Sequence, residues 1–125
     1  MYGVQKPSEY DPLDSFNYRQ WFNRVYKYIL SRVKIKNVTT TYTIENDVFY
    51  VRVDCTAGAI TVTLPVALGY AGRRLFIKKI DSSANAVTVS RSGTDTIEGS
   101  NTISLAAQWN KQELISNGNN CWEKF

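Results

Sequence analysis

Between Ser15 and Val33, apolar side chains recur every three or four positions, the spacing that gathers side chains on one face of an α-helix. This stripe consists of Tyr18, Trp21, Phe22, Val25, Tyr28, Ile29 and Val33. Asp14 or Ser15, shortly after Pro12, is a suitable N-cap. We therefore predict one amphipathic helix in this part of the chain.

Both faces of this predicted helix carry aromatic residues, which favours contact with another molecule. Tyr18 and Tyr26 add to the central part of the stripe, which consists of Trp21, Phe22, Val25, Tyr28 and Ile29. The run from Leu30 to Val38 has the character of a spacer between the helix and the strands after it. Packing of the helix onto the chain's own β domain is the alternative interpretation.

From about Thr39 onward the pattern changes to period two, which is typical of strands. In the clearest example, Ile60, Val62 and Leu64 alternate with Thr61 and Thr63. Turn-forming residues interrupt the pattern at intervals of about ten residues. The pattern predicts a mainly β fold, a small antiparallel β-sandwich or barrel-like knob preceded by an N-terminal arm and one amphipathic α-helix.

The chain thus divides into three parts: residues 1–14 as an extended N-terminal arm, residues 15–36 as a basic amphipathic helix and linker, and residues 37–125 as the β knob. Pro7 and Pro12 stiffen the arm. A β knob of this size has a small core and open sheet edges. Oligomerisation would bury those edges and add apolar contacts, so we expect the knob to self-associate.

Positive charge is concentrated near the helix. No acidic residue occurs between Ser15 and Ile44, and the basic residues there are Arg19, Arg24, Lys27, Arg32, Lys34 and Lys36. The charges could bind an acidic protein face, a nucleic acid or a membrane surface, or could simply be solvated. No known nucleic-acid-binding module is present, and no apolar run approaches the roughly 20 residues that cross a bilayer. We therefore expect neither a nucleic-acid partner nor a membrane partner.

The chain contains no histidine, which excludes Ser-His-Asp, Cys-His and His-metal catalysis. Its two cysteines, Cys55 and Cys121, are isolated from other soft ligands, so we expect no metal site, no cofactor and, for both residues, a place in the core. A bridge between them is the alternative. Asp95 and Glu98 could be paired catalytic carboxylates, but we interpret them as turn residues.

Arg73, Arg74, Lys78 and Lys79 fall on one predicted strand. Because successive side chains of a strand point to opposite faces, they cannot form a single basic patch. We expect some of these cations to form ion pairs with Asp81 or Glu98.

Four landmarks follow one another along residues 58–122, about half of the chain. They are a Thr/Val strand ending in Leu64-Pro65, a glycine before Ile77-Lys78-Lys79, the segment DSSANAVTV, and Thr96-Ile97-Glu98-Gly99 leading to an aromatic strand and a closing NGN-x-x-W. This order resembles the β knob found repeatedly in tail-fibre and head-decoration proteins of tailed bacteriophages. The resemblance implies a trimeric structural protein at the outside of the virion, and not an enzyme.

A tail fibre normally has a long shaft, whereas only a helix of about five turns precedes this knob. We therefore predict a capsid decoration or cement protein, made in the host cytoplasm and located on the outer surface of the phage particle. It would bind itself as a homotrimer, and the major capsid protein or other virion proteins. The expected partner-binding residues are Tyr2, Tyr10, Arg19, Trp21, Phe22, Arg24, Tyr26 and Lys27.

Two rival functions remain open. The first is a short tail-fibre or receptor-binding knob, whose loops Asp81 to Asn85 and Asn117 to Asn120 would contact a host surface glycan. The second is a hydrolytic enzyme that uses Asp95 or Glu98.

Overall fold

A computed structural model describes residues 18–31 and 34–125, without the side chains of residues 28–31. It forms two compact units, Met1–Val33 and Lys34–Phe125, which we describe separately. The expected arm, residues 1–14, lies outside the described residues, as do Tyr2 and Tyr10. No described helix is long and apolar enough to cross a membrane.

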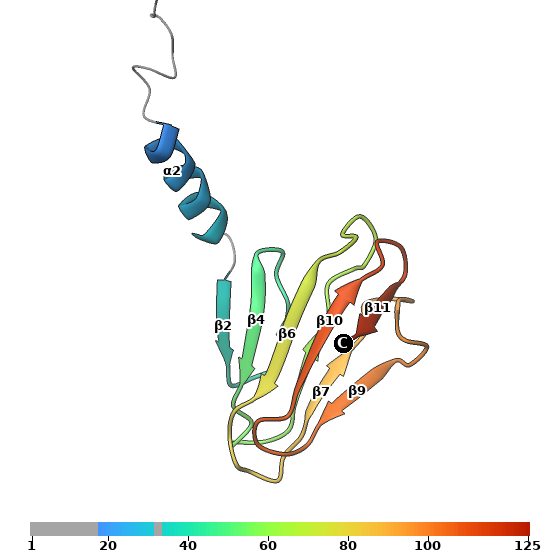
Figure 1. Cartoon of the computed structure of the whole chain (residues 1–125). Coiled ribbons are helices and arrows are strands. Elements are labelled where there is room, and N and C mark those ends of the chain that lie inside the picture. The colour runs from blue at the N-terminus through green and yellow to red at the C-terminus, as the bar shows by residue number, and fades with distance from the viewer. Residues whose placement is uncertain (1–17, 32–33) are drawn as a thin grey trace, which may run out of the picture. The chain divides into compact units, whose positions relative to one another are not determined.

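The first unit contains the predicted helix. Helix α2 covers Tyr18–Ser31 (Figure 1), so the sequence prediction of a helix is confirmed for these residues. The expected start at Ser15 and the last member of the apolar stripe, Val33, lie outside the described residues.

The second unit is a β knob that contains ten described strands. They are β2 (Lys34–Val38), β3 (Tyr42–Thr43), β4 (Val48–Val53), β5 (Ile60–Thr63), β6 (Arg74–Lys79), β7 (Val87–Ser90), β8 (Thr96–Ile97), β9 (Thr102–Leu105), β10 (Lys111–Ser116) and β11 (Cys121–Lys124). A six-stranded sheet has the order β2-β4-β6-β10-β11-β8, and a four-stranded sheet has the order β3-β5-β7-β9 (Figure 1). The predicted mainly β sandwich is confirmed.

The pairing of the strands differs from the antiparallel arrangement expected from the sequence. Three pairings are antiparallel, β6 with β10, β10 with β11, and β7 with β9, and the other five are parallel. The reason is that consecutive strands from β2 to β7 alternate between the two sheets. The four pairs that this alternation makes, β2 with β4, β3 with β5, β4 with β6 and β5 with β7, are all parallel, as a crossover connection gives.

The core lies between the two sheets and is built from the alternating apolar positions of both. Val62, Leu64, Leu75, Ile77 and Trp122 are fully buried there. The Trp122 indole Nε1 donates a hydrogen bond to the Pro65 carbonyl oxygen at 3.1 Å, which satisfies its one polar atom. The alternation predicted for β5 is therefore confirmed, because Ile60 and Val62 are buried and Thr61 is exposed.

Strand β2 lies where the sequence suggested a spacer. It pairs in parallel with β4 and forms one edge of the six-stranded sheet. Four of its five residues are exposed and only Val38 is buried, so it lacks the alternation by which a strand is recognised. Lys34 and Lys36 on this edge oppose pairing with a strand of another molecule.

Gly118, in the loop between β10 and β11, has a φ of 83°, and a Cβ built on it would lie 2.6 Å from the Ala71 Cβ. We expect Gly118→Ala to lower the free energy of unfolding by about 1–3 kcal/mol, because it adds a steric clash to backbone strain. Urea denaturation would measure the change. Gly99→Ala is the matched control, since Gly99 has a φ of 86° and open space around it. A loss no larger than that of Gly99→Ala would rule out the clash.

Candidate functional site

The outer face of the six-stranded sheet, the side turned away from the core, carries a row of apolar side chains across neighbouring strands. Ile35 is opposite Tyr50, and Tyr50 is opposite Phe76. Ile35 is 62% exposed, and the two aromatic residues are half-buried. These side chains cover no part of the core, so they form an apolar surface on the knob itself.

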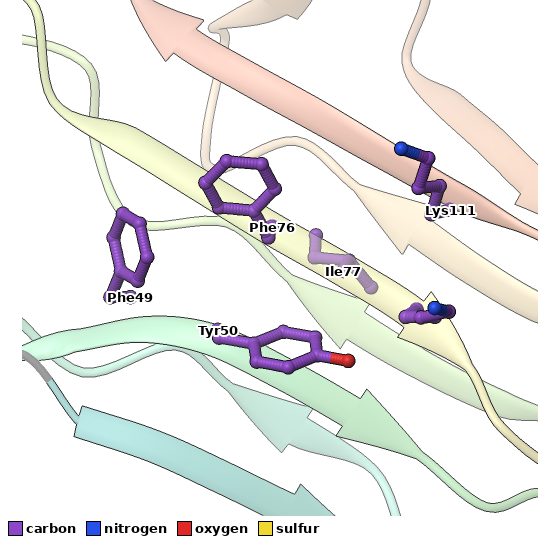
Figure 2. A pocket seen from close by; sticks show the side chains of 6 residues that line it. Phe49, Tyr50, Phe76, Ile77 and Lys111 are labelled. Atoms are coloured by element: carbon purple, nitrogen blue, oxygen red, sulfur yellow. The ribbon is translucent and has the colours of Figure 1, made fainter.

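A hollow of about 310 Å³ opens on this face. It is lined by Phe49, Tyr50, Phe76, Ile77, Lys78 and Lys111. The rings of Phe49 and Phe76 meet edge to face at 5.0 Å between centroids. Figure 2 shows these two rings at one end of the hollow and Lys111 at the other. The hollow therefore combines apolar walls with a cationic end.

A β-bulge explains why two consecutive aromatic residues line the same hollow. The register between β2 and β4 shifts at Lys34 and Ile35, which are opposite Val48 and Tyr50 respectively. Phe49 is therefore the extra residue of β4, and a bulge interrupts the normal alternation of side chains. Strict alternation would have placed Phe49 and Tyr50 on opposite faces of the sheet.

A second row of side chains, next to the apolar row, is cationic. Arg52 is opposite Lys78, and Lys78 is opposite Lys111. None of these three cations has a carboxylate partner within 4 Å among the described residues. Like charges directly opposite each other on a sheet are destabilising. This row therefore favours an anionic group placed against it.

Trp109 borders the cationic row. Its indole is 55% exposed, and the Lys78 Nζ lies 5.3 Å from the ring centroid. Its φ of 69° is unusual for a bulky residue, and it is held there because the Trp109 N–H donates to the Lys79 carbonyl oxygen at 2.8 Å. Strained residues of this kind concentrate at functional positions, which supports a role for this face in contacts.

The β11 side of the same face has the opposite charge. Glu123 and Phe125 are exposed, Phe125 by 70%. Glu123 is opposite Ile115 of β10, on the outer side, because its neighbour Trp122 points into the core. Between the two sides, Arg74 and Glu113 neutralise each other through a 2.8 Å ion pair. We call Glu123, Phe125 and Ile115 the acidic corner of the face.

Helix α2 presents the other candidate residues at its surface. The side chains of Arg19, Trp21, Phe22, Arg24, Tyr26 and Lys27 are all exposed. Trp21 packs against Tyr18 at 5.8 Å between ring centroids, and Phe22 stacks on Tyr26 at 6.4 Å, as side chains three or four residues apart on a helix can. The structure therefore brings the predicted residues of α2 together on one exposed aromatic and basic element.

Inside the knob, Lys79 and Asp81 form a buried ion pair. The Lys79 Nζ lies 2.8 Å from Asp81 Oδ2, and both side chains are buried. Asp81 also accepts hydrogen bonds from the Cys55 N–H at 2.8 Å, from the Ser83 N–H at 3.0 Å and from the Ser83 hydroxyl. The expected pairing of the strand's cations with Asp81 or Glu98 is thus confirmed for Lys79 with Asp81.

These contacts set the charge states of the pair. Burial alone raises the pKa of Asp81, but hydrogen bonds from Lys79, Ser83 and Cys55 outweigh it and hold that pKa far below its usual range. Burial lowers the pKa of Lys79, but Asp81 and Cys55 outweigh it and the pKa lies above its usual value. Both groups are therefore charged at neutral pH, and their role is to tie the loop after β6 to the loop after β4.

The remaining candidate groups are two carboxylates, Asp95 and Glu98, and the two cysteines. The Asp95 carboxylate accepts a hydrogen bond from the Ala67 N–H at 2.9 Å, and the Glu98 carboxylate accepts one from the Lys124 N–H at 2.8 Å. Cys55 is buried in the core as expected, but the expected core position of Cys121 is wrong, because Cys121 is half-buried; both are free thiols. Burial raises the pKa of Cys55, which makes its thiol unreactive. No group of acidic residues and cysteines suited to a metal occurs among the described residues.

The two loops considered for glycan contact lie at opposite ends of the knob. Residues 81–85 follow the end of β6, and residues 117–120 follow the end of β10. Because β6 and β10 are antiparallel neighbours, the two loops leave opposite ends of the sheet. They cannot form one continuous binding surface on a single copy.

A comparison of the chain with models of known protein families gives no match, and a comparison with curated proteins gives none either.

Proposed function

We propose that this chain is a virion structural protein, a capsid decoration or cement protein of a tailed bacteriophage that trimerises through its β knob and attaches through its N-terminal arm and helix. The observation that carries the proposal is the outer face of the six-stranded sheet, where Ile35, Tyr50, Phe76 and Trp109 offer apolar surface outside the core. Such a surface is suited to contact with protein. The bacteriophage assignment rests on the sequence resemblance alone.

The exposed residues of α2 support a second contact, separate from self-association. Trp21, Phe22 and Tyr26 are large anchors of the type that dominates interfaces, and Arg19, Arg24 and Lys27 suit an acidic partner surface. In a trimer three such helices act together, so three weak contacts give one strong attachment. Attachment to the particle is accordingly expected to weaken at high salt.

A non-enzymatic role agrees with how the chain uses its carboxylates. Asp95 and Glu98 both accept hydrogen bonds from backbone N–H groups, and the buried Asp81 carboxylate is occupied by hydrogen bonds and an ion pair. None of these groups is presented to a substrate in the hollow.

The solution mass of the purified full chain tests self-association. Light scattering is expected to give about three times the chain mass of 14.2 kDa. A mass of one chain at micromolar concentration would contradict the trimer.

Immunogold labelling of purified phage particles with an antibody against the chain tests the location. Label spread over the head is expected. Label confined to the tail at few copies would instead support the receptor-binding alternative, and intact particles without label would contradict a virion role.

A further inference from the structure

The outer face of the six-stranded sheet carries opposite charges on its two sides. One side has the hollow with Lys78 and Lys111 and no carboxylate partner for either cation among the described residues. The other side has Glu123, which likewise has no cationic partner within 4 Å in the described part of the chain. Beside Glu123 lies the Phe125 ring, which is 70% exposed. The cations and the hollow of one side are therefore suited to the carboxylate and the exposed ring of the other side.

Glu123 lies too far along the sheet from Lys78 and Lys111 to pair with either cation within one copy. Glu123 is on β11, whereas Lys78 is on β6, and β10 lies between these strands. Neighbouring strands are about 4.8 Å apart. Glu123 is opposite Ile115 of β10, four residues along that strand from Lys111, a separation of about 13 Å at the usual rise of a strand. A contact between the two sides therefore requires a second copy.

The manner of contact follows from the charges. A symmetric contact in which the cationic rows of two copies meet would bring Arg52, Lys78 and Lys111 against the same residues of the partner, which is unfavourable. A contact between unlike sides avoids this repulsion. Unlike sides of one face can meet in an isologous pair, which makes both contacts at once, or in a heterologous ring, which closes when the rotation between copies allows it. The trimer of the proposed function corresponds to the ring.

We propose that the acidic corner of one copy, with Glu123 and Phe125, packs against the hollow of the next copy, with Lys78 and Lys111 beside Glu123 and the aromatic walls around Phe125. Three such contacts close a ring in which the outer faces of the six-stranded sheets surround the axis. This inference rests on the trimer of the proposed function and names its interface. Burying Phe125 between the rings of Phe49, Tyr50 and Phe76 removes apolar surface from water.

A charge exchange on the full chain tests this interface. Lys111 and Glu123 are exposed, so their substitution leaves the core intact. Lys111→Glu and Glu123→Lys are each expected to reduce the mass in light scattering from three chains to one, because each places like charges against each other. The combined variant Lys111→Glu/Glu123→Lys is expected to restore the trimer, because it exchanges the two charges.

Arg91→Glu is the matched control. It makes the same change of charge next to β7, in the four-stranded sheet, and is expected to leave the trimer unchanged. A wild-type trimer that survives both single substitutions, or that is dissociated only by Arg91→Glu, would overturn this interface while leaving self-association intact. A wild-type monomer would contradict the trimer itself. Circular dichroism of each variant shows that the knob is folded.

Discussion

Asp81→Ala is expected to lower the free energy of unfolding of the knob by about 3–5 kcal/mol, because it leaves the Lys79 ammonium buried without its counter-charge. The same substitution removes the acceptor of the Cys55 and Ser83 N–H groups. Small domains have a total free energy of unfolding of about 5–15 kcal/mol, so the expected loss is a large part of the stability of the knob. Urea denaturation at one fixed protein concentration would measure the loss, since self-association also stabilises the folded chain.

The exposed ion pair of Arg74 and Glu113 provides the control for Asp81→Ala. Glu113→Ala breaks a contact of the same length, 2.8 Å, at the surface, where such pairs contribute about 0–1 kcal/mol. If the two variants lost equal stability, burial would not be the source of the effect.

The pH dependence gives Asp81→Ala a second readout. The pKa of Asp81 is lowered in the folded chain, so its contribution is fully present above its unfolded pKa of about 3.9 and is lost as the pH falls below that value. Wild-type stability is therefore expected to decline in acid more steeply than that of Asp81→Ala. The raised pKa of Lys79 keeps its contribution present up to its unfolded pKa of about 10.4, and it is lost as the pH rises above that value.

Trp122→Ala is expected to lower the free energy of unfolding by about 3–5 kcal/mol, because it empties a large, fully buried position of the core. It also leaves the Pro65 carbonyl oxygen without its hydrogen bond from the indole. The shift of the urea midpoint at a constant slope would measure the loss.

Trp109→Ala is the matched control for Trp122→Ala, because it makes the same substitution at an exposed indole. Its indole lies next to the Lys78 ammonium, a contact worth about 0.5–1 kcal/mol at a surface. Measurement under conditions that keep both variants monomeric separates folding from assembly. Equal losses would show that the core does not depend on Trp122.

Several strands could be predicted from the sequence because their two faces have different environments. Ile60 and Val62 of β5 are buried and Thr61 is exposed. The alternation of apolar and polar residues in the sequence matches this difference in burial. Strand β2 could not be found in this way, because it is an edge strand with four exposed residues. Only its pairing with β4 identifies it as part of the sheet.

The direction of pairing could not be read from the sequence. Period-two patterning is the same for a parallel and an antiparallel strand when one face is buried. The direction depends on the path that the chain takes between two neighbouring strands, and the period-two pattern does not record that path. Turn residues mark where the chain bends, but they do not indicate which sheet the next strand joins.

The candidate site on the sheet was partly visible in the sequence. Tyr50 and Arg52, two residues apart on β4, share a face, and so do Phe76 and Lys78 on β6. Their outward position could be inferred from the buried residues between them. The register that aligns these residues into rows, and the bulge that adds Phe49, depend on pairing with neighbouring strands and carry no signal in the chain itself.

The order in which the sheets close has a consequence for synthesis. Each of the strands β2 to β7 pairs with a strand that is close to it in the sequence. Strand β6, however, gains its second partner only from β10, and β8 gains its only partner from β11. Until those last strands leave the ribosome, the growing knob exposes an open edge at β6. Trp122 and the Glu123 of the acidic corner are both synthesised with β11, the last strand. An interrupted chain would therefore lack both a complete core and the surface proposed for assembly, and unfinished copies would be kept out of the proposed trimer.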